Sequence, residues 1–142
     1  MSSFDPRAVE KLCLGLPGAT LVVQWHDCRV YKVGGKMFAM IVPDKKEPPE
    51  IWFKASDLSA RLLAEISGIR PAPYLARAGW LAARRDNGLS KRDLDAYLRN
   101  AHALILARLP KKTQAAIADG RKIDAQRPAR RKRRLSEMKE AQ

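Results

Sequence analysis

The clearest hydrophobic pattern in the chain is a pair of short β-type runs separated by two glycines. The segments Val30 to Val33 and Met37 to Val42 are rich in β-branched, aromatic and other apolar residues, and Gly34-Gly35 lies between them. A two-residue Gly-Gly loop suits the primed turns that close antiparallel hairpins, because glycine adopts positive φ without strain. The pattern therefore predicts a tight hairpin and an antiparallel start to the fold.

A two-residue turn also fixes the expected register of this hairpin. The expected cross-strand pairs are Val33 with Lys36, Tyr31 with Phe38, and Arg29 with Met40. Alternation of side chains then assigns two faces. One face is expected to hold Val33, Tyr31, Phe38 and Met40, and the other Lys32, Met37, Ala39 and Ile41. Both faces are partly apolar, so alternation leaves open which of them is covered.

Helix starts are marked by residues that cap free backbone N–H groups. Asp5-Pro6 predicts a first helix that ends at Pro17-Gly18, and Ser56 or Asp57 predicts a second. Ser90 and Asp93 resemble a capping box before the clearest helix, Leu94 to Leu109. A weaker helix is expected around residues 113–118. Further strands are expected at residues 19–25, 50–54 and 78–84, and residues 70–74 are expected to be irregular because of their prolines.

This order of elements predicts an α+β fold, with an antiparallel sheet of about five strands and helices packed on one face. At 142 residues the chain is long enough for one domain with a real core, which we place at residues 1–110. Residues 111–142 form a basic extension. Beyond Gly120 the composition has little to bury, so this part is expected to be flexible.

Charge is the strongest compositional signal. The chain holds 28 Lys and Arg against 15 Asp and Glu, a formal charge of +13, and residues 108–142 account for +8 of it. Such an excess favours an anionic partner, DNA before RNA, although a solvated basic surface would have the same composition. Lys91 and Arg92 lie in the first turn of a helix, where the helix dipole disfavours cations. The candidate phosphate contacts are Arg29, Lys32, Lys36, Arg84, Arg85, Lys91, Arg92, Arg130, Arg131, Lys132, Arg133 and Arg134.

Metal binding and catalysis find little support in the sequence. His26 and Cys28 alternate along one strand, but only His102 and Cys13 remain to complete a zinc site. The same His26–Cys28 pair is the only local candidate for a nucleophile with its base, and no phosphate loop or dinucleotide fingerprint is present. We therefore expect no enzyme activity, no metal and no cofactor.

Two cysteines are too few for a disulfide framework, which favours a reducing compartment. The first residues lack the charged start and apolar core of a secretory signal, and no run is apolar enough to span a bilayer. The expected location is the cytoplasm, without membrane contact.

Several short segments, taken in order, resemble those of the MmcQ/YjbR family. They are Leu16-Pro17-Gly18, Trp25, Lys32 to Ala39, Phe53-Lys54, Pro71 to Tyr74, Trp80 and the Leu94-to-Leu109 helix. The resemblance covers residues 5–110. It implies a frataxin-like α+β sandwich, described as a double-wing module, and a predicted DNA-binding role without catalytic residues. An iron site, which a frataxin-like fold suggests, is disfavoured because the first helix offers only Asp5 and Glu10.

The functional prediction is a non-enzymatic DNA-binding protein whose contacts to phosphate are largely independent of sequence. The alternative is a protein-interaction adaptor that uses exposed apolar residues of the second sheet face, such as Met37 and Ile41. A third functional hypothesis is that a small ligand binds in a pocket beside Trp80 and Tyr74. The strand aromatics Trp25, Trp52, Phe53 and Trp80 are expected in the core rather than on a stacking surface.

Overall fold

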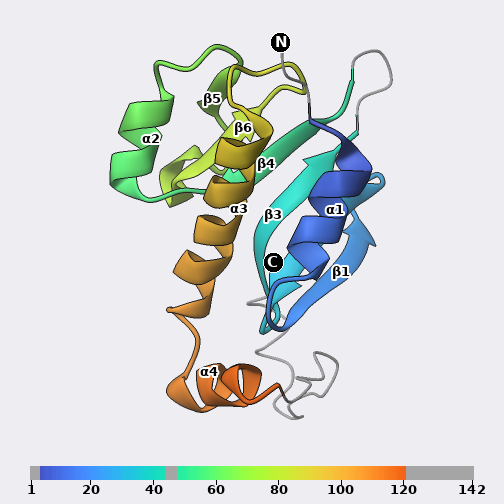
Figure 1. Ribbon diagram of the computed structural model, residues 1–142, viewed down its shortest axis with the longest axis vertical. Helices are drawn as coiled ribbons and strands as arrows, with labels where there is room; N and C mark the ends of the chain where they lie inside the picture. The colour runs from blue at the N-terminus through green and yellow to red at the C-terminus, as the bar shows by residue number, and fades with distance from the viewer. Residues whose placement is uncertain (1–3, 44–47, 121–142) are drawn as a thin grey trace.

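The computed structural model describes residues 4–43 and 48–120. Six strands form one antiparallel sheet in the order β1-β2-β3-β4-β6-β5, and α1 and α3 pack on one of its faces (Figure 1). The strands are β1 (Ala19–Gln24), β2 (Cys28–Val33), β3 (Lys36–Val42), β4 (Glu50–Lys54), β5 (Ile69–Pro71) and β6 (Trp80–Ala83). The helices are α1 (Pro6–Leu14), α2 (Asp57–Leu63), α3 (Lys91–Leu106) and α4 (Lys111–Ala118), with a 3-10 turn, η1, at Ala76–Ala78.

The predicted helix starts are confirmed by their caps. The Asp5 carboxylate accepts a hydrogen bond from the backbone N–H of Arg7, and Pro6 is the first residue of α1. The hydroxyl oxygens of Ser56 and Ser90 each accept a bond from the N–H three residues later. These bonds satisfy donors that no helical carbonyl can reach. Helix α1 ends at Leu14, earlier than the expected Pro17-Gly18.

The predicted hairpin is present, but its register changes after two residue pairs. Gly34 and Gly35 both have positive φ, 59° and 83°, as the primed turn requires, and Val33 pairs with Lys36 as expected. A bulge then shifts the register between Tyr31 and Lys32. Tyr31 pairs with Ala39 and Arg29 with Ile41, so the expected pairs Tyr31–Phe38 and Arg29–Met40 are wrong. Phe38 is the extra residue that opposes no single partner.

The bulge exchanges side chains between the two faces. Phe38 and Ala39 both belong to the core beneath the helices, together with Tyr31, Val33 and Ile41. Met40 turns instead to the second face, where it packs with Val30 and Trp80. The expected grouping of Met40 with Tyr31, and of Ala39 and Ile41 with Lys32, is therefore wrong. The helix-covered face is the one that holds Tyr31.

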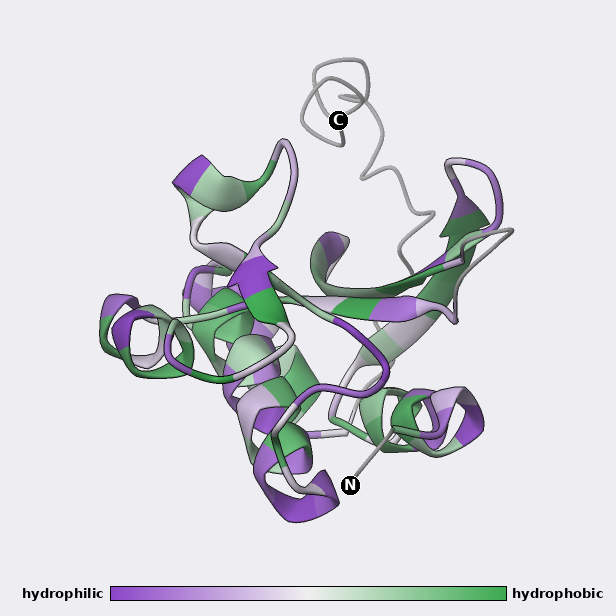
Figure 2. Cartoon of the chain, turned by 90° about the horizontal axis from the view of Figure 1, so that it is seen from above, coloured by the Kyte–Doolittle hydropathy of each residue, from purple (hydrophilic) through white to green (hydrophobic). Residues whose placement is uncertain are grey.

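Part of the second face is covered by the chain segment between β5 and β6. Ala72 and Leu75 of this segment pack against Trp80. Figure 2 shows the sheet edge-on, with α1 and α3 on one side and η1 on the other. Strand β5 occupies the start of the stretch expected to be irregular, and Pro71 is tolerated there because β5 is an edge strand that needs no donor on its outer side. With β5, the sheet has six strands instead of about five.

The C-terminal end of α3 and the helix after it close one end of the molecule. Leu109 packs in the main core, and a Cβ on Gly34 would lie 2.6 Å from its Cδ1 atom. The weak helix expected around 113–118 is confirmed as α4, and its Ile117 packs in the same core beside Gly18. Within the described residues, no helix is long and apolar enough to cross a membrane.

Candidate nucleic-acid interface

Among the described residues, the cations predicted to contact DNA fall at two opposite ends of the sheet. Lys32 and Lys36 flank the β2–β3 turn. Strand β4 runs antiparallel to β3 and β6 antiparallel to β4, so Ala83, which pairs with Ile51, lies at the end of β3 that is remote from this turn. Arg84 and Arg85 follow Ala83 at that remote end. Helix α3 begins there at Lys91 and runs back about 24 Å to the turn.

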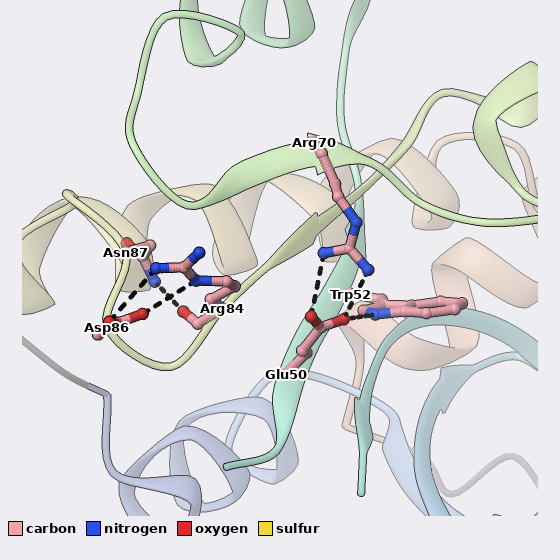
Figure 3. A network of polar contacts seen from close by, with 6 residues as sticks. All are labelled: Glu50, Trp52, Arg70, Arg84, Asp86 and Asn87. Atoms are coloured by element: carbon pink, nitrogen blue, oxygen red, sulfur yellow. Dashed lines mark hydrogen bonds and ion pairs between the residues drawn. The ribbon is translucent and has the colours of Figure 1, made fainter. Parts of the chain in front are cut away.

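At the remote end most of these cations already have partners. Arg84 pairs with Asp86, with Nε 3.1 Å from Oδ1 (Figure 3). This pair lowers the pKa of the Asp86 carboxyl. The Arg85 guanidinium donates to the carbonyl oxygen of Phe4. Lys91 pairs with Asp95 one turn along α3, which gives this first-turn cation a structural role. Arg92 is exposed and makes no ion pair within the described residues.

On the second sheet face, the positive charge of Arg70 near this remote end is also compensated. Glu50 accepts from both guanidinium nitrogens of Arg70, at 3.0 and 3.2 Å, and from the indole N–H of Trp52 at 2.9 Å (Figure 3). The carboxylate therefore compensates the Arg70 charge.

Arg29 lies on the helix-covered side, apart from Lys32 and Lys36. Its guanidinium forms a bidentate pair with Glu10 of α1, with Nε 2.6 Å from Oε1. The buried Tyr31 hydroxyl donates to the same oxygen at 2.7 Å. The Arg29 bond is the main reason why the pKa of Glu10 is lowered. Arg29 therefore ties α1 to the sheet. The predicted tail contacts Arg130 to Arg134 lie outside the described residues.

A hollow, which we call the tryptophan pocket, is lined both by residues at the β2–β3 turn and by Trp25 of the β1–β2 turn. It has a volume of about 440 Å³, and its walls include Trp25, Met37 and Trp80. Lys32, Lys36 and Arg108 are its cations. Lys32 is half-buried, and this burial lowers the pKa of its ammonium group. Two predicted contacts, Lys32 and Lys36, thus line one concave site.

A second hollow, the arginine pocket, shares Arg108 with the first. It measures about 600 Å³ and lies between η1, α2 and the end of α3. Its charged lining residues are Lys54, Asp57, Arg61, Arg77 and Arg108. We call the two pockets together the basic groove. The groove is lined by six different cations and one carboxylate.

The lysine of the arginine pocket is held in place by burial. Lys54 is 9% exposed, and its ammonium group donates a hydrogen bond to the carbonyl oxygen of Ala78. Burial, followed by the positive charge of Arg108, lowers its pKa, and Asp57 opposes this effect. Its amine is therefore a fixed donor in a positively charged environment.

The three arginines of this pocket lack the partners found at the remote end. Arg61, Arg77 and Arg108 are all exposed, and none of them makes an ion pair or hydrogen bond within the described part of the chain. Clustered like charges repel one another, so this arrangement does not stabilise the fold. An anion bound between them would remove the repulsion.

Trp25 departs from the expectation that the strand aromatics are buried. Phe53 and Trp80 are in the cores, but Trp25 lies in the β1–β2 turn and is 47% exposed. Trp25, His26 and Asp27 all have positive φ, between 49° and 74°. This left-handed conformation costs free energy for a residue with a Cβ, and more for Trp25 than for Asp27.

Sequence reasoning missed Lys54, Arg61, Arg77, Arg108 and Trp25 as site residues. The four cations come from β4, α2, η1 and the segment between α3 and α4, so no local run marks them. In the sequence, nothing distinguishes Arg61 and Arg77 from ordinary solvent-exposed residues of a helix and a loop. One usable signal was Arg108, a cation two residues before Pro110, where the sequence ends the long helix.

The remaining chemical candidates are not assembled into sites. Burial raises the pKa of the Cys28 thiol and raises that of Cys13 to about 12, which leaves little reactive thiolate at neutral pH. His102 is buried, with Nε2 2.7 Å from the carbonyl oxygen of Pro17. Within residues 4–43 and 48–120, no three His, Cys, Asp or Glu side chains come together as metal ligands would.

Two residues named for other functions lie elsewhere than expected. Ile41 is 5% exposed under the helices, so it cannot form the exposed apolar surface of an adaptor. Trp80 does line a pocket, but Tyr74 is fully exposed and belongs to neither half of the basic groove.

Comparisons with known proteins agree on the fold. The chain is similar in structure to the Deinococcus radiodurans protein DR2400, described as a DUF419 domain, with 18% identity, a TM-score of 0.68, and coverage of 80% of this chain and 87% of that one. It is also similar to a Pseudomonas syringae protein, with 15% identity, a TM-score of 0.59, and coverage of 71% and 98%. No curated protein matches the sequence. The YjbR family model matches residues 14–104, well over half of the chain, and the protein therefore belongs to the YjbR family.

Proposed function

We propose that this protein is a non-enzymatic DNA-binding protein of the cytoplasm that holds the phosphate backbone in the basic groove. One observation carries the proposal: six cations and a single carboxylate line two adjoining hollows, and three of the arginines have no partner within the described residues. The contacts are to phosphate and are largely independent of base sequence.

Phosphate is the anion that this groove suits. Guanidinium groups bind phosphate oxygens through two parallel hydrogen bonds, and several cations spaced along a surface release condensed counterions when DNA binds. A phosphate near Lys54 would also favour its charged form, against the burial and the Arg108 charge that now lower its pKa. The DNA-binding role implied by the family resemblance supports the same proposal.

The predicted cations are not equivalent in this proposal. Lys32 and Lys36 line the groove and are retained as contacts. Arg84 and Lys91 have carboxylate partners at the remote end, and Arg29 is paired with Glu10. Arg130 to Arg134 are proposed as an additional, non-specific phosphate contact on the grounds of their sequence alone.

Fluorescence anisotropy of a labelled DNA with the full chain tests the proposal at two salt concentrations. The first variant removes three groove charges through Arg61→Gln, Arg77→Gln and Arg108→Gln. The matched control removes three exposed charges at the remote end through Arg7→Gln, Arg84→Gln and Arg92→Gln. Both variants lower the net charge equally, so a difference between them reports position and not overall charge.

We expect the groove variant to lose affinity by about tenfold or more at low salt. The slope of log K against log salt should also fall, by the amount that corresponds to the loss of about two to three phosphate contacts. The control should remain within a fewfold of the wild type. Equal losses in the two variants would show that only net charge matters. Wild-type protein that binds no DNA at micromolar concentration would overturn the proposal.

A further inference from the structure

We infer that the tryptophan pocket receives an unpaired base of single-stranded DNA, while the adjoining arginine pocket holds the phosphates of the same strand. This inference rests on the proposed DNA-binding function and specifies which form of DNA the groove takes. Trp25, the shape of the pocket and the placement of the cations carry it.

Trp25 is an exposed aromatic side chain in a strained backbone. Nearly half of its surface is accessible, and its indole makes no hydrogen bond within the described part of the chain. Its turn has three successive residues with positive φ, none of them glycine. Such strain is retained where the surrounding structure fixes it, and it is most common at binding sites. The turn thus keeps a large flat aromatic group at the edge of a hollow.

The pocket beside Trp25 combines an apolar interior with a charged lining. Trp80 and Met37 contribute apolar surface, and Lys32 and Arg108 contribute charge. A volume of about 440 Å³ is within the range of pockets that enclose small organic groups. A nucleobase presents an apolar π-face that stacks on tryptophan. The backbone phosphate of the same nucleotide carries the negative charge that the lysines and the arginine attract.

The lining of the pocket places an aromatic group and cations around one hollow. Trp25 lies beyond the end of β2 at which Gln24 pairs with Cys28, whereas Lys36 follows the other end of β2, and both line the pocket. Arg108 lines this pocket and the arginine pocket as well. A bound chain would therefore have a stacking position at one end and phosphate contacts at the other.

An intact duplex could not use this arrangement fully. In a duplex each base is stacked between its neighbours, so its faces are unavailable to a tryptophan inside a hollow. A single strand can turn one base out of the stack at little cost. The arginines bind phosphate in either form, so Trp25 should separate single-stranded from duplex binding.

The test compares a labelled single-stranded oligonucleotide of about ten nucleotides with the duplex of the same length, using the full chain. Trp25→Ala removes the aromatic ring on which a base would stack, and Trp25→Phe keeps a smaller aromatic ring there. Tyr74→Ala is the matched control, because Tyr74 is fully exposed and lines neither pocket. Anisotropy gives the affinities, and the part of the tryptophan-fluorescence quenching that is lost in Trp25→Ala reports stacking on Trp25, since the chain also holds Trp52 and Trp80.

We expect the wild type to prefer the single strand, and Trp25→Ala to weaken single-strand binding by about tenfold with little change for the duplex. Trp25→Phe should recover part of the loss and Tyr74→Ala should cause none. Equal affinity for both DNAs, or an equal effect of Trp25→Ala on both, would overturn the inference and leave the proposed function intact. Failure of the wild type to bind either DNA would overturn both.

Discussion

The ammonium group of Lys54 occupies the space that a side chain at Gly79 would need. A Cβ on Gly79 would lie 2.9 Å from Lys54 Nζ, and Gly79 has a φ of 80°, a conformation that glycine adopts freely. The absence of a side chain at residue 79 is therefore what lets Lys54 reach the carbonyl of Ala78 at the wall of the arginine pocket.

We expect Gly79→Ala to weaken DNA binding, because the new methyl group would displace the Lys54 amine. The matched control is Gly120→Ala, since Gly120 has the same φ of 80° and no atom of the described residues lies within 4 Å of its Cβ position. Both changes should destabilise the fold by about 1 kcal/mol through the backbone. Only Gly79→Ala should lower DNA affinity, by about threefold or more. Equal affinities for the two folded variants would remove Lys54 from the site.

Glu10 should make the stability of the protein sensitive to acid. Its pKa is lowered in the folded state, chiefly by Arg29, so its contribution is complete above the ordinary glutamate pKa and is lost as the pH falls through the folded value. We expect Glu10→Gln to lower the free energy of unfolding by about 1 kcal/mol at neutral pH, and the difference from wild type to shrink below about pH 4.

Urea unfolding between pH 3 and pH 7 measures this difference, with roughly 1 kcal/mol well within its resolution. Glu65→Gln is the control, because Glu65 is exposed and has no ion pair or hydrogen bond within the described residues. A Glu10→Gln variant as stable as the control variant at every pH would contradict the structural role of the Glu10–Arg29 pair.

The two glycines of the β2–β3 turn should respond differently to alanine. Both have positive φ, but a Cβ on Gly34 would lie 2.6 Å from Leu109, whereas no atom in the described part of the chain lies within 4 Å of a Cβ on Gly35. We expect Gly35→Ala to cost about 1 kcal/mol of unfolding free energy, and Gly34→Ala about 1 kcal/mol more, because the buried Leu109 must move. Urea titrations of the two variants test this, and equal losses would mean that Leu109 adjusts freely.

The fold was largely predictable from local signals. Caps at Asp5 and Ser90, and the glycine pair at the hairpin, act within a few residues and are visible in the sequence. The bulge at Phe38 was not visible, because both faces of the hairpin are apolar and alternation fits either register. Only packing against α3 decides that Phe38 and Ala39 both point to the core.

The candidate site was predictable only in part. Lys32 and Lys36 were found because the hairpin carries them. Arg61, Arg77 and Arg108 come together through the positions of η1, α2 and α3, which depend on tertiary packing. The pairing of Arg84 with Asp86 likewise emerges only when the turn after β6 has formed.

The basic tail should add affinity without adding selectivity. We expect replacement of Arg130, Arg131, Lys132, Arg133 and Arg134 by alanine to lower DNA affinity and to reduce the slope of log K against log salt by up to about 4. The preference for single strands should persist, because it arises in the groove. Anisotropy over a range of salt concentrations checks this, and an unchanged slope would exclude the tail as a phosphate contact.

Photo-crosslinking tests the central claim most directly, because it identifies the residues that touch DNA. The full chain would be irradiated with a single-stranded oligonucleotide containing halogenated uracil, and the adducts located by mass spectrometry. We expect adducts on Trp25 and on the Lys32-to-Met37 segment. Adducts confined to residues 84–92, or to the tail, would contradict this claim.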